Sequence, residues 1–193
     1  DIHGEVYLIE DENGRLRPER HGGYVWRAVP YDTGMVGYQN DMINTLRLWS
    51  VEVPAAEEAN YATIESRRSL EDLTAVLYPD DSNERGKKTR LMQEYFFVSA
   101  GIQSIVRYYL KLNHPLTMMS EKIAIHINDT HPALCVSELM RLLLDDHDLP
   151  WEQAWAITVK VMSYTNHTIM AEALEKWPID LFKEVIPRNY QII

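Results

Sequence analysis

The chain has 193 residues, a length that suits one good-sized domain better than two. Hydrophobic residues make up 46% of it and charged residues 25%, which is the composition of a folded globular protein, and no run of about 18 apolar residues predicts a membrane span. The net charge of −10 argues against nucleic acid as a partner, because neutralising phosphates requires a basic surface.

The start of the sequence and its cysteine content lead to further expectations. Residue 1 is not methionine and the first residues lack the basic start and apolar core of a signal peptide, so we expect the chain to begin inside a longer polypeptide. Cys135 is the only cysteine, which excludes an internal disulfide and a multi-cysteine metal site. A reducing, cytoplasmic location follows as the simplest expectation, with Cys135 a buried structural thiol on the apolar side of a helix.

The first half of the chain is predicted to be rich in β-structure, followed by a helix. Strand-like runs cover residues 5–10 and 24–32, and "DENG" at 11–14 supplies a turn in which Gly14 adopts positive φ without strain. Residues 69–79 have the pattern of a short amphipathic helix with Ser69 as its cap, ended by a proline.

The second half alternates between strand and helix patterns. The predicted elements are a long helix over 90–112, a strand over 122–128, and helices over about 132–146, 149–164 and 170–177. This order predicts an α/β sheet fold. In such sheets ligands bind beyond the carboxyl ends of the strands, at the loops that open the helices.

Two polar turns stand where such a fold places its binding site. Residues 128–131, "NDTH", follow the predicted strand, and residues 165–168, "TNHT", repeat the same kinds of side chain before a later helix. If they converge on one cleft, their amide, hydroxyl, imidazole and carboxylate groups suit a neutral polyhydroxylated ligand, whose hydroxyls both donate and accept. The alternative is structural, with Asp129 or Thr130 capping a helix that Pro132 begins.

A metal site is the other chemical alternative for the first turn. His126, Asp129 and His131, with His167 completing the set, have a spacing that a metal ion accepts. We expect no metal there, because the period-two geometry of a strand does not aim His126 at the same point as the turn residues. Composition and spacing alone therefore reach an α/β domain with a polar cleft that suits a sugar.

Five long motifs add a resemblance to a known family. They are "PYDTGMVGYQNDMINTLRLWS", "LYPDDSNERGKKTRLMQEYFFVSAG", "KIAIHINDTHPALCVSELMRLLLDD", "PWEQAWAITVKVMSYTNHTIMAEALEKWP" and "PRNYQII". In this order they closely resemble the α-glucan phosphorylases, the family of glycogen, starch and maltodextrin phosphorylases. The resemblance covers nearly the whole chain and is weakest in residues 1–23 and 52–68.

The resemblance implies a fold and an activity for the parent protein. The family has a glycosyltransferase-B arrangement of two Rossmann-like domains, and it cuts terminal α-1,4-glucosidic bonds with inorganic phosphate to give glucose 1-phosphate. Residues 1–193 resemble a single partial domain, the latter part of the N-terminal domain. Pyridoxal phosphate would be the cofactor, held by a lysine of a C-terminal domain that lies outside this chain, and the parent would be a homodimer. We expect the isolated chain to be inactive; the alternative is a stand-alone α-glucan-binding or regulatory module.

The resemblance also suggests roles for individual residues. His167 matches the histidine that contacts the glucosyl unit at the cleavage point, through its ring and its main-chain carbonyl, and is the predicted catalytic residue. Asp81 falls at the acidic position of a mobile gate loop, although Asp80 and Ser82 stand where the family often has asparagine. The predicted substrate-binding residues are Asp81, Asn128, Asp129, His131, Asn166 and Glu175.

Overall fold

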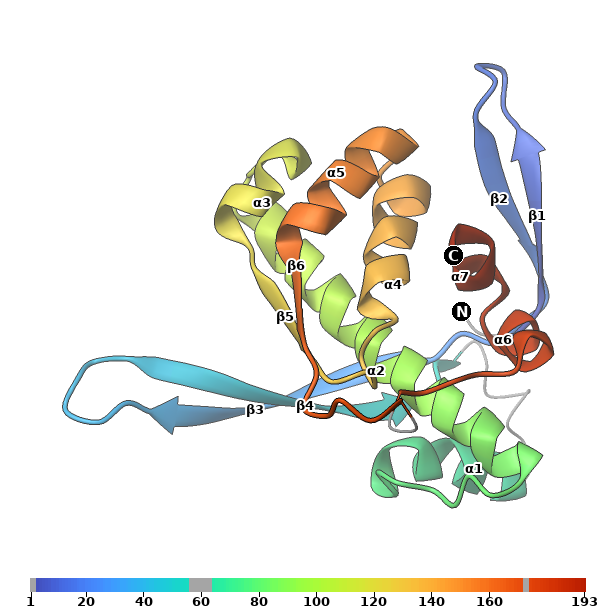
Figure 1. Cartoon of the computed structure of the whole chain (residues 1–193), viewed down its shortest axis with the longest axis horizontal. Coiled ribbons are helices and arrows are strands. Elements are labelled where there is room, and N and C mark those ends of the chain that lie inside the picture. Colours follow the sequence, from blue (N-terminus) through green and yellow to red (C-terminus); the bar gives the residue numbers. More distant parts are fainter. Residues whose placement is uncertain (1–2, 56–63, 172–173) are drawn as a thin grey trace. The chain divides into compact units, whose positions relative to one another are not determined.

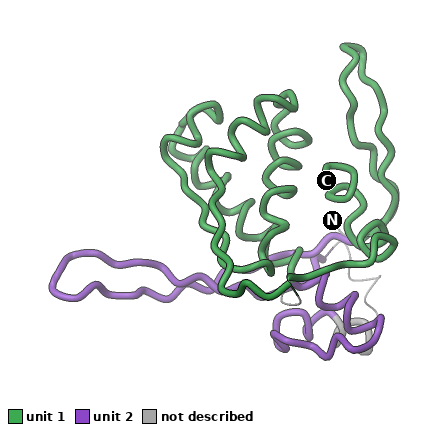
Figure 2. The backbone as a smooth tube through the Cα atoms, viewed as in Figure 1, with its two compact units in different colours: residues 1–23, 94–193 green, residues 24–93 purple. Residues whose placement is uncertain are grey.

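The computed structural model describes residues 3–55, 64–171 and 174–193. The chain divides into two compact units, one formed by residues 1–23 and 94–193 and the other by residues 24–93 (Figure 2). In chain order (Figure 1) the elements are β1 (Glu5–Glu10), β2 (Leu16–His21), β3 (Arg27–Val36), β4 (Ile43–Glu52), α1 (Ile64–Ala75), α2 (Glu84–Lys111), the 3₁₀ turn η2 (Leu116–Met118), α3 (Met119–Lys122), β5 (Ile125–Asn128), α4 (Cys135–Arg141), the π-helical segment η3 (Leu142–Asp146), α5 (Trp151–Val161), β6 (Met162–Thr165), α6 (Ile179–Val185) and α7 (Pro187–Ile192). This mixture of helices and strands agrees with the predicted α/β class.

The first unit opens with an antiparallel hairpin. β1 pairs with β2 from Glu5 opposite His21 to the turn at residues 11–14. Gly14 has a φ of +75°, and its N–H donates to the Asp11 carbonyl at 2.9 Å. The strand and turn predicted for this segment are therefore confirmed.

The second unit contains the other hairpin and a helix. β3 and β4 pair antiparallel from Arg27 opposite Glu52 to Val36 opposite Ile43, so the strand predicted from residue 24 begins later and runs longer. α1 packs against β4. Ser69 lies inside α1, so the predicted cap at that residue is wrong; the helix has already begun at Ile64.

The long helix α2 begins at Glu84 rather than at the predicted residue 90, and its residues 94–111 belong to the first unit. The apolar residues that the helical pattern places near one face are buried, with Ile105 half-buried: Leu91, Tyr95, Val98, Ile102, Ile105, Val106 and Tyr109. α4 packs against α5 and α7, and α3 packs against α5. Leu139 of α4 and Leu143 of η3 are completely inaccessible to solvent, so these helices share one continuous hydrophobic core.

A parallel pair of strands lies beside these helices. β5 and β6 pair from Ile125 opposite Met162 to Asn128 opposite Thr165, and α4, η3 and α5 make the crossover between them. The prediction that the α5 helix runs to residue 164 is wrong, because Met162 has extended backbone angles and residues 162–165 pair with β5. The tertiary pairing overrides a pattern that is helical when read locally.

Two predicted helix boundaries also differ. α4 begins at Cys135, and its N-cap residue Leu134 makes no side-chain capping bond, so Asp129 and Thr130 do not cap it. The helix predicted over 170–177 includes Glu172 and Ala173, which lie outside the described residues, and Leu174–Trp177 are not helical. Trp177 precedes Pro178, which disfavours helical backbone at that residue.

A buried ion pair joins the helices of the core. Glu138 has no exposed surface, and its carboxylate accepts hydrogen bonds from Arg141 Nε and Nη2, both at 2.9 Å, and from Ser99 Oγ at 2.6 Å and Asn189 Nδ2 at 3.2 Å. Burial raises the pKa of Glu138, but the charge and hydrogen bonds of Arg141, with those of Ser99 and Asn189, outweigh it and leave the pKa below its usual value. The carboxylate therefore remains ionised inside the core.

Cys135 is buried on α4, as predicted. Desolvation, followed by the negative charge of Glu138, raises the pKa of its thiol to about 11. The length and hydropathy of the described helices are insufficient for any of them to cross a membrane.

Candidate functional site

The carboxyl ends of β5 and β6 bring the two polar turns together. Asn128 lies opposite Thr165 at the end of the strand pair, and the Asp129 N–H donates to the Thr165 carbonyl at 2.8 Å. His167 follows the last residue of β6 by two positions, and its Nε2 lies 2.6 Å from Asn128 Oδ1. The two turns therefore lie side by side, because parallel strands end at the same edge of a sheet, while their sharing of one cleft stays a prediction.

The contact with Asn128 determines which nitrogen of His167 carries the proton. Asn128 Oδ1 is a carbonyl oxygen and can only accept, so in the neutral imidazole Nε2 donates and Nδ1 keeps its lone pair. The His167 side chain is exposed. Nδ1 of His167 is therefore available as a hydrogen-bond acceptor for a ligand, while the hydrogen bond from Nε2 to Asn128 at the end of β5 holds the ring in place.

The first turn has a left-handed backbone at a residue other than glycine. Asp129 has a φ of +72°, and its carboxylate Oδ1 accepts from the Thr130 N–H at 2.8 Å. Such a conformation costs about 1 kcal/mol for a residue with a Cβ, although aspartate tolerates it better than most. Backbone strain of this kind is found disproportionately at binding and catalytic sites.

Two buried polar atoms lie in these turns without hydrogen-bond partners in the described part of the chain. They are Thr130 Oγ1 in the first turn and Asn166 Oδ1 in the second. A buried polar group without a partner costs free energy, so native structures normally supply water or a ligand to such atoms. Both atoms thus mark places where a polar molecule would be stabilised.

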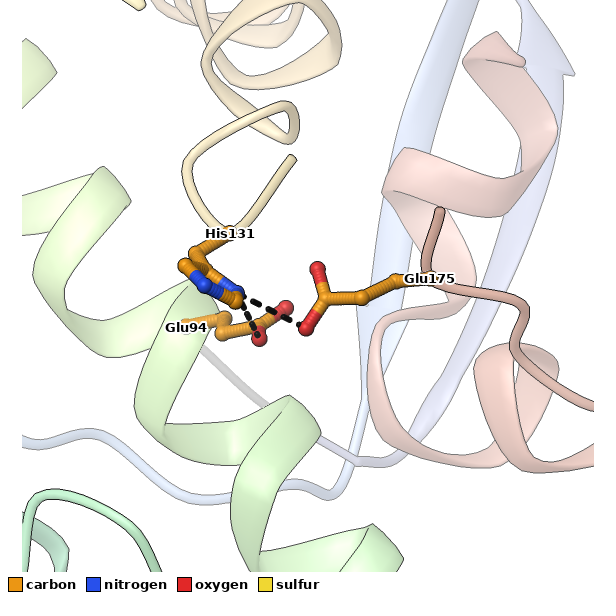
Figure 3. A group of neighbouring side chains, drawn as sticks. All are labelled: Glu94, His131 and Glu175. Atoms are coloured by element: carbon orange, nitrogen blue, oxygen red, sulfur yellow. Dashed lines mark hydrogen bonds and ion pairs between the residues drawn. The ribbon is translucent and has the colours of Figure 1, made fainter. Parts of the chain in front are cut away.

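A histidine and two glutamates meet beside the first turn (Figure 3). His131 Nδ1 donates to Glu175 Oε1 at 2.9 Å and lies 3.9 Å from Glu94 Oε1. His131 comes from the turn after β5, Glu175 from the segment before α6, and Glu94 from α2. His131 and Glu175 were among the predicted substrate-binding residues, but Glu94 was not. The signal that could have found Glu94 is an acidic residue at a buried position of an amphipathic helix.

A cavity of about 540 Å³ adjoins this group. Its lining includes Glu94, Glu175, Thr130 and the tryptophans Trp151, Trp155 and Trp177. Mostly apolar and aromatic walls with a few polar groups are typical of small-molecule sites. Among the described residues that line it, none is a lysine or an arginine.

The remaining predicted site residue, Asp81, belongs to the other compact unit. It is exposed on the loop between α1 and α2. The neighbouring Asp80 carboxylate accepts from the Ser82 N–H at 3.0 Å, and this hydrogen bond lowers the pKa of Asp80. The role of Asp81 as a gate residue stays a prediction.

The metal alternative drawn from the sequence is not assembled in the fold. His126 Nε2 lies 2.7 Å from Thr165 Oγ1, on the strand pair rather than in the turn. One group of histidine and acidic side chains has donor atoms close enough to share one ion, among the described residues 3–55, 64–171 and 174–193. It consists of Glu94, His131 and Glu175. This group contains neither His126 nor Asp129.

The match to known sequences defines the class of protein to which this fold and site belong. The sequence profile of the carbohydrate phosphorylases matches residues 1–193, so the chain belongs to the carbohydrate phosphorylase family. This confirms the resemblance carried by the five motifs.

Glycogen phosphorylases are among its relatives. The chain is 49% identical over 190 residues to glycogen phosphorylase of Bacillus subtilis (strain 168), an alignment that covers 98% of this chain and 24% of that protein. Glycogen phosphorylase of Chlamydia pneumoniae is 45% identical over 199 residues, covering 100% and 24%, and the muscle form of Ovis aries is 42% identical over 181 residues, covering 86% and 22%. The chain spans about a quarter of the length of these relatives.

Proposed function

We propose that this chain forms the sugar-binding wall of the active-site cleft of a glucan phosphorylase, the enzyme that splits terminal α-1,4-glucosidic bonds with inorganic phosphate and releases glucose 1-phosphate. The observation that carries the proposal is the meeting of the two polar turns, in which His167 Nε2 lies 2.6 Å from Asn128 Oδ1 at the ends of β5 and β6. Membership of the carbohydrate phosphorylase family supports the reaction class.

In this proposal His167 orients the glucosyl unit that is cleaved. With Nε2–H donated to Asn128, the free lone pair on Nδ1 accepts a hydrogen bond from a sugar hydroxyl. The main-chain carbonyl of His167 presents its negative end to the same sugar. A carbonyl dipole aimed at the anomeric carbon stabilises the positive charge that develops there as the glucosidic bond breaks.

The other turn residues would complete the wall. Asn166 Oδ1, buried without a partner in the described part of the chain, accepts from a second hydroxyl in this account. Asp129, His131 and Glu175 are further proposed contacts to the sugar. Of these, Glu175 lines the cavity, and its hydrogen bond with His131 keeps both side chains in place. Asp81 lies on a loop that we propose to gate the cleft.

Pyridoxal phosphate, the cofactor implied by the family, does not fit the residues present here. Its phosphate is an anion that basic side chains or helix amino ends hold, whereas the cavity lining carries two glutamates and, among its described residues, no lysine or arginine. We therefore place the cofactor and its lysine outside this chain. The isolated chain is accordingly proposed to be inactive, because catalysis requires both walls of a closed cleft.

Other properties of the parent belong to the same proposal. Its fold would be the glycosyltransferase-B arrangement, with this chain as a Rossmann-like part of the N-terminal domain. Its partners would be an α-1,4-glucan, inorganic phosphate and a second copy of the enzyme, without nucleic acid, in the cytoplasm.

A chimera tests the function. The quarter of the Bacillus subtilis glycogen phosphorylase that aligns with this chain is replaced by residues 1–193, since 49% identity over 190 residues makes the exchange conservative. The chimera is assayed with maltodextrin and phosphate for glucose 1-phosphate, and we expect product. A folded chimera with bound cofactor but without product would refute the proposal.

Glucan binding by the isolated chain distinguishes two hypotheses: that the chain is one wall of a larger cleft, and that it is an independent glucan-binding module. Titration with maltooligosaccharide should give no binding or only millimolar binding, because half of the contacts are missing. Micromolar binding by the isolated chain would contradict the two-wall account and establish the module.

A further inference from the structure

The group formed by Glu94, His131 and Glu175 offers a mixed set of metal ligands, of which His131 and Glu175 are also proposed substrate-binding residues. Its donor atoms are one imidazole nitrogen and two carboxylate oxygens, all within 4.8 Å of one another. They come from three separate segments of the same compact unit (Figure 3). A site built from residues far apart in sequence depends on the folded structure, which makes it selective for the native state.

The spacing of the donor atoms matches a small cation with little adjustment. In a tetrahedral zinc site with bonds of about 2.0 Å, two ligand atoms lie about 3.3 Å apart. His131 Nδ1 lies 2.9 Å from Glu175 Oε1 and 3.9 Å from Glu94 Oε1, values on either side of that separation. Side-chain shifts of less than about 1 Å would therefore bring three ligands to one ion.

Charge and burial favour a dication at this point. The Glu94 side chain is 6% exposed and that of Glu175 is 22% exposed, so two carboxylates share a poorly solvated space with a histidine. Both carboxylates would attract a divalent cation at this point, and the limited access of solvent would screen that attraction only weakly. Imidazole with carboxylates is a ligand set that suits Zn²⁺ and its transition-metal neighbours better than Mg²⁺ or Ca²⁺, which prefer oxygen ligands alone.

The adjoining cavity supplies access and a fourth position. Glu94 and Glu175 both line the cavity of about 540 Å³, so an ion can approach from that side. Thr130 lines it as well, and its buried Oγ1 has no hydrogen-bond partner in the described part of the chain. A water on the ion would give this hydroxyl a partner, which is the arrangement of an open zinc site with three protein ligands.

We propose that Glu94, His131 and Glu175 bind one divalent transition-metal ion of the Zn²⁺ class. The ion ties α2, the turn after β5 and the segment before α6 together, and it competes with the direct hydrogen bond between His131 and Glu175. The site stands on these contacts alone and does not depend on the proposed phosphorylase function.

Metal binding to the full 193-residue chain tests the site. The chain is stripped with a chelator and titrated with Zn²⁺ by calorimetry, and the bound metal is counted after gel filtration. We expect one ion per chain, with a dissociation constant of about 10 μM or tighter. Loss of a residue that only hydrogen-bonds to a metal ligand costs about 10- to 100-fold in metal affinity, so loss of a ligand itself, in Glu94→Gln or His131→Ala, should weaken binding by about 100-fold or more.

His126→Ala is the matched control, because His126 is an exposed histidine on β5 that contacts Thr165 and lies outside the cluster. It should leave the affinity for Zn²⁺ unchanged. Binding that persists in His131→Ala, or the absence of 1:1 binding to the unsubstituted chain, would overturn the proposal. If a variant does not fold, Co²⁺ bound to the unsubstituted chain decides: intense visible absorption of four-coordinate Co²⁺ supports the site, and a weak octahedral spectrum contradicts it.

Discussion

The buried carboxylate of Glu138 provides the sharpest test of how this fold is held together. Glu138→Gln keeps the shape of the side chain but removes its charge. Arg141, whose side chain is 7% exposed, then keeps its positive charge beside Asp146, whose Oδ1 lies 3.3 Å from Arg141 Nη1 and which is itself half exposed. The four hydrogen bonds that Glu138 accepts weaken at the same time.

The expected cost follows from this geometry. Removing one partner of a buried, hydrogen-bonded ion pair costs about 3–5 kcal/mol, because the other charge remains in the protein interior. For a chain of this length each kcal/mol lowers the melting temperature by about 2–4 °C, so the decrease should be about 6–20 °C.

Urea denaturation followed by far-ultraviolet circular dichroism measures the effect. Glu152→Gln, an exposed acid on α5, serves as the control and should leave the urea midpoint nearly unchanged. The double variant Glu138→Leu/Arg141→Met should be less destabilised than the sum of the two single changes, because both charges leave the core together. A loss below about 1 kcal/mol for Glu138→Gln is the range of surface ion pairs, and it would refute the reasoning.

Two further predictions follow from the same helix. The pKa of Glu138 in the folded chain lies below its ordinary value of 4.5, so its contribution to stability is present above about pH 4.5 and is lost as the pH falls through the lower folded value. The urea midpoint of the unsubstituted chain should therefore fall more steeply between pH 6 and pH 3 than that of Glu138→Gln. Parallel curves for the two chains would contradict this. Burial and a thiol pKa of about 11 should protect Cys135 from chemical modification. A disulfide reagent should therefore modify it slowly at neutral pH in the native chain and rapidly in urea. Fast modification of the native chain would show that the thiol is not buried.

Local patterns in the sequence were sufficient to predict elements in which one pattern of apolar residues continues along the element. The strand at residues 5–10 and the long helix α2 were predicted because alternation and a helical stripe persist over their lengths. β6 was missed, because residues 162–165 continue the apolar pattern of α5 and become a strand only by pairing with β5. Pairing between segments 37 residues apart, such as Ile125 and Met162, is a tertiary property that a local window does not contain.

The residues of the candidate site likewise include some that were predicted from the sequence and some that were missed. The approach of the two polar turns was predicted from their similar side chains before two predicted helices. The pairing of β5 with β6, which brings Asn128 and His167 together, was not predicted. Glu94 was missed because its neighbours are set by the packing of α2 beside the turn at His131, which no spacing along the chain encodes. The structural alternative, a cap at Asp129 or Thr130, is not formed: Asp129 has positive φ and its carboxylate accepts from the adjacent Thr130 N–H instead.

The measurement that tests the central claim most directly is the kcat/KM of phosphorolysis for His167→Ala in the chimera with the Bacillus subtilis enzyme. Loss of the Nδ1 acceptor held by Asn128 should lower kcat/KM by about 100-fold or more, while the circular dichroism spectrum and the cofactor content stay unchanged. Thr168→Ala, the next residue along the same turn, should keep most of the rate. A near-unchanged rate for His167→Ala would remove His167 from the site and contradict the account.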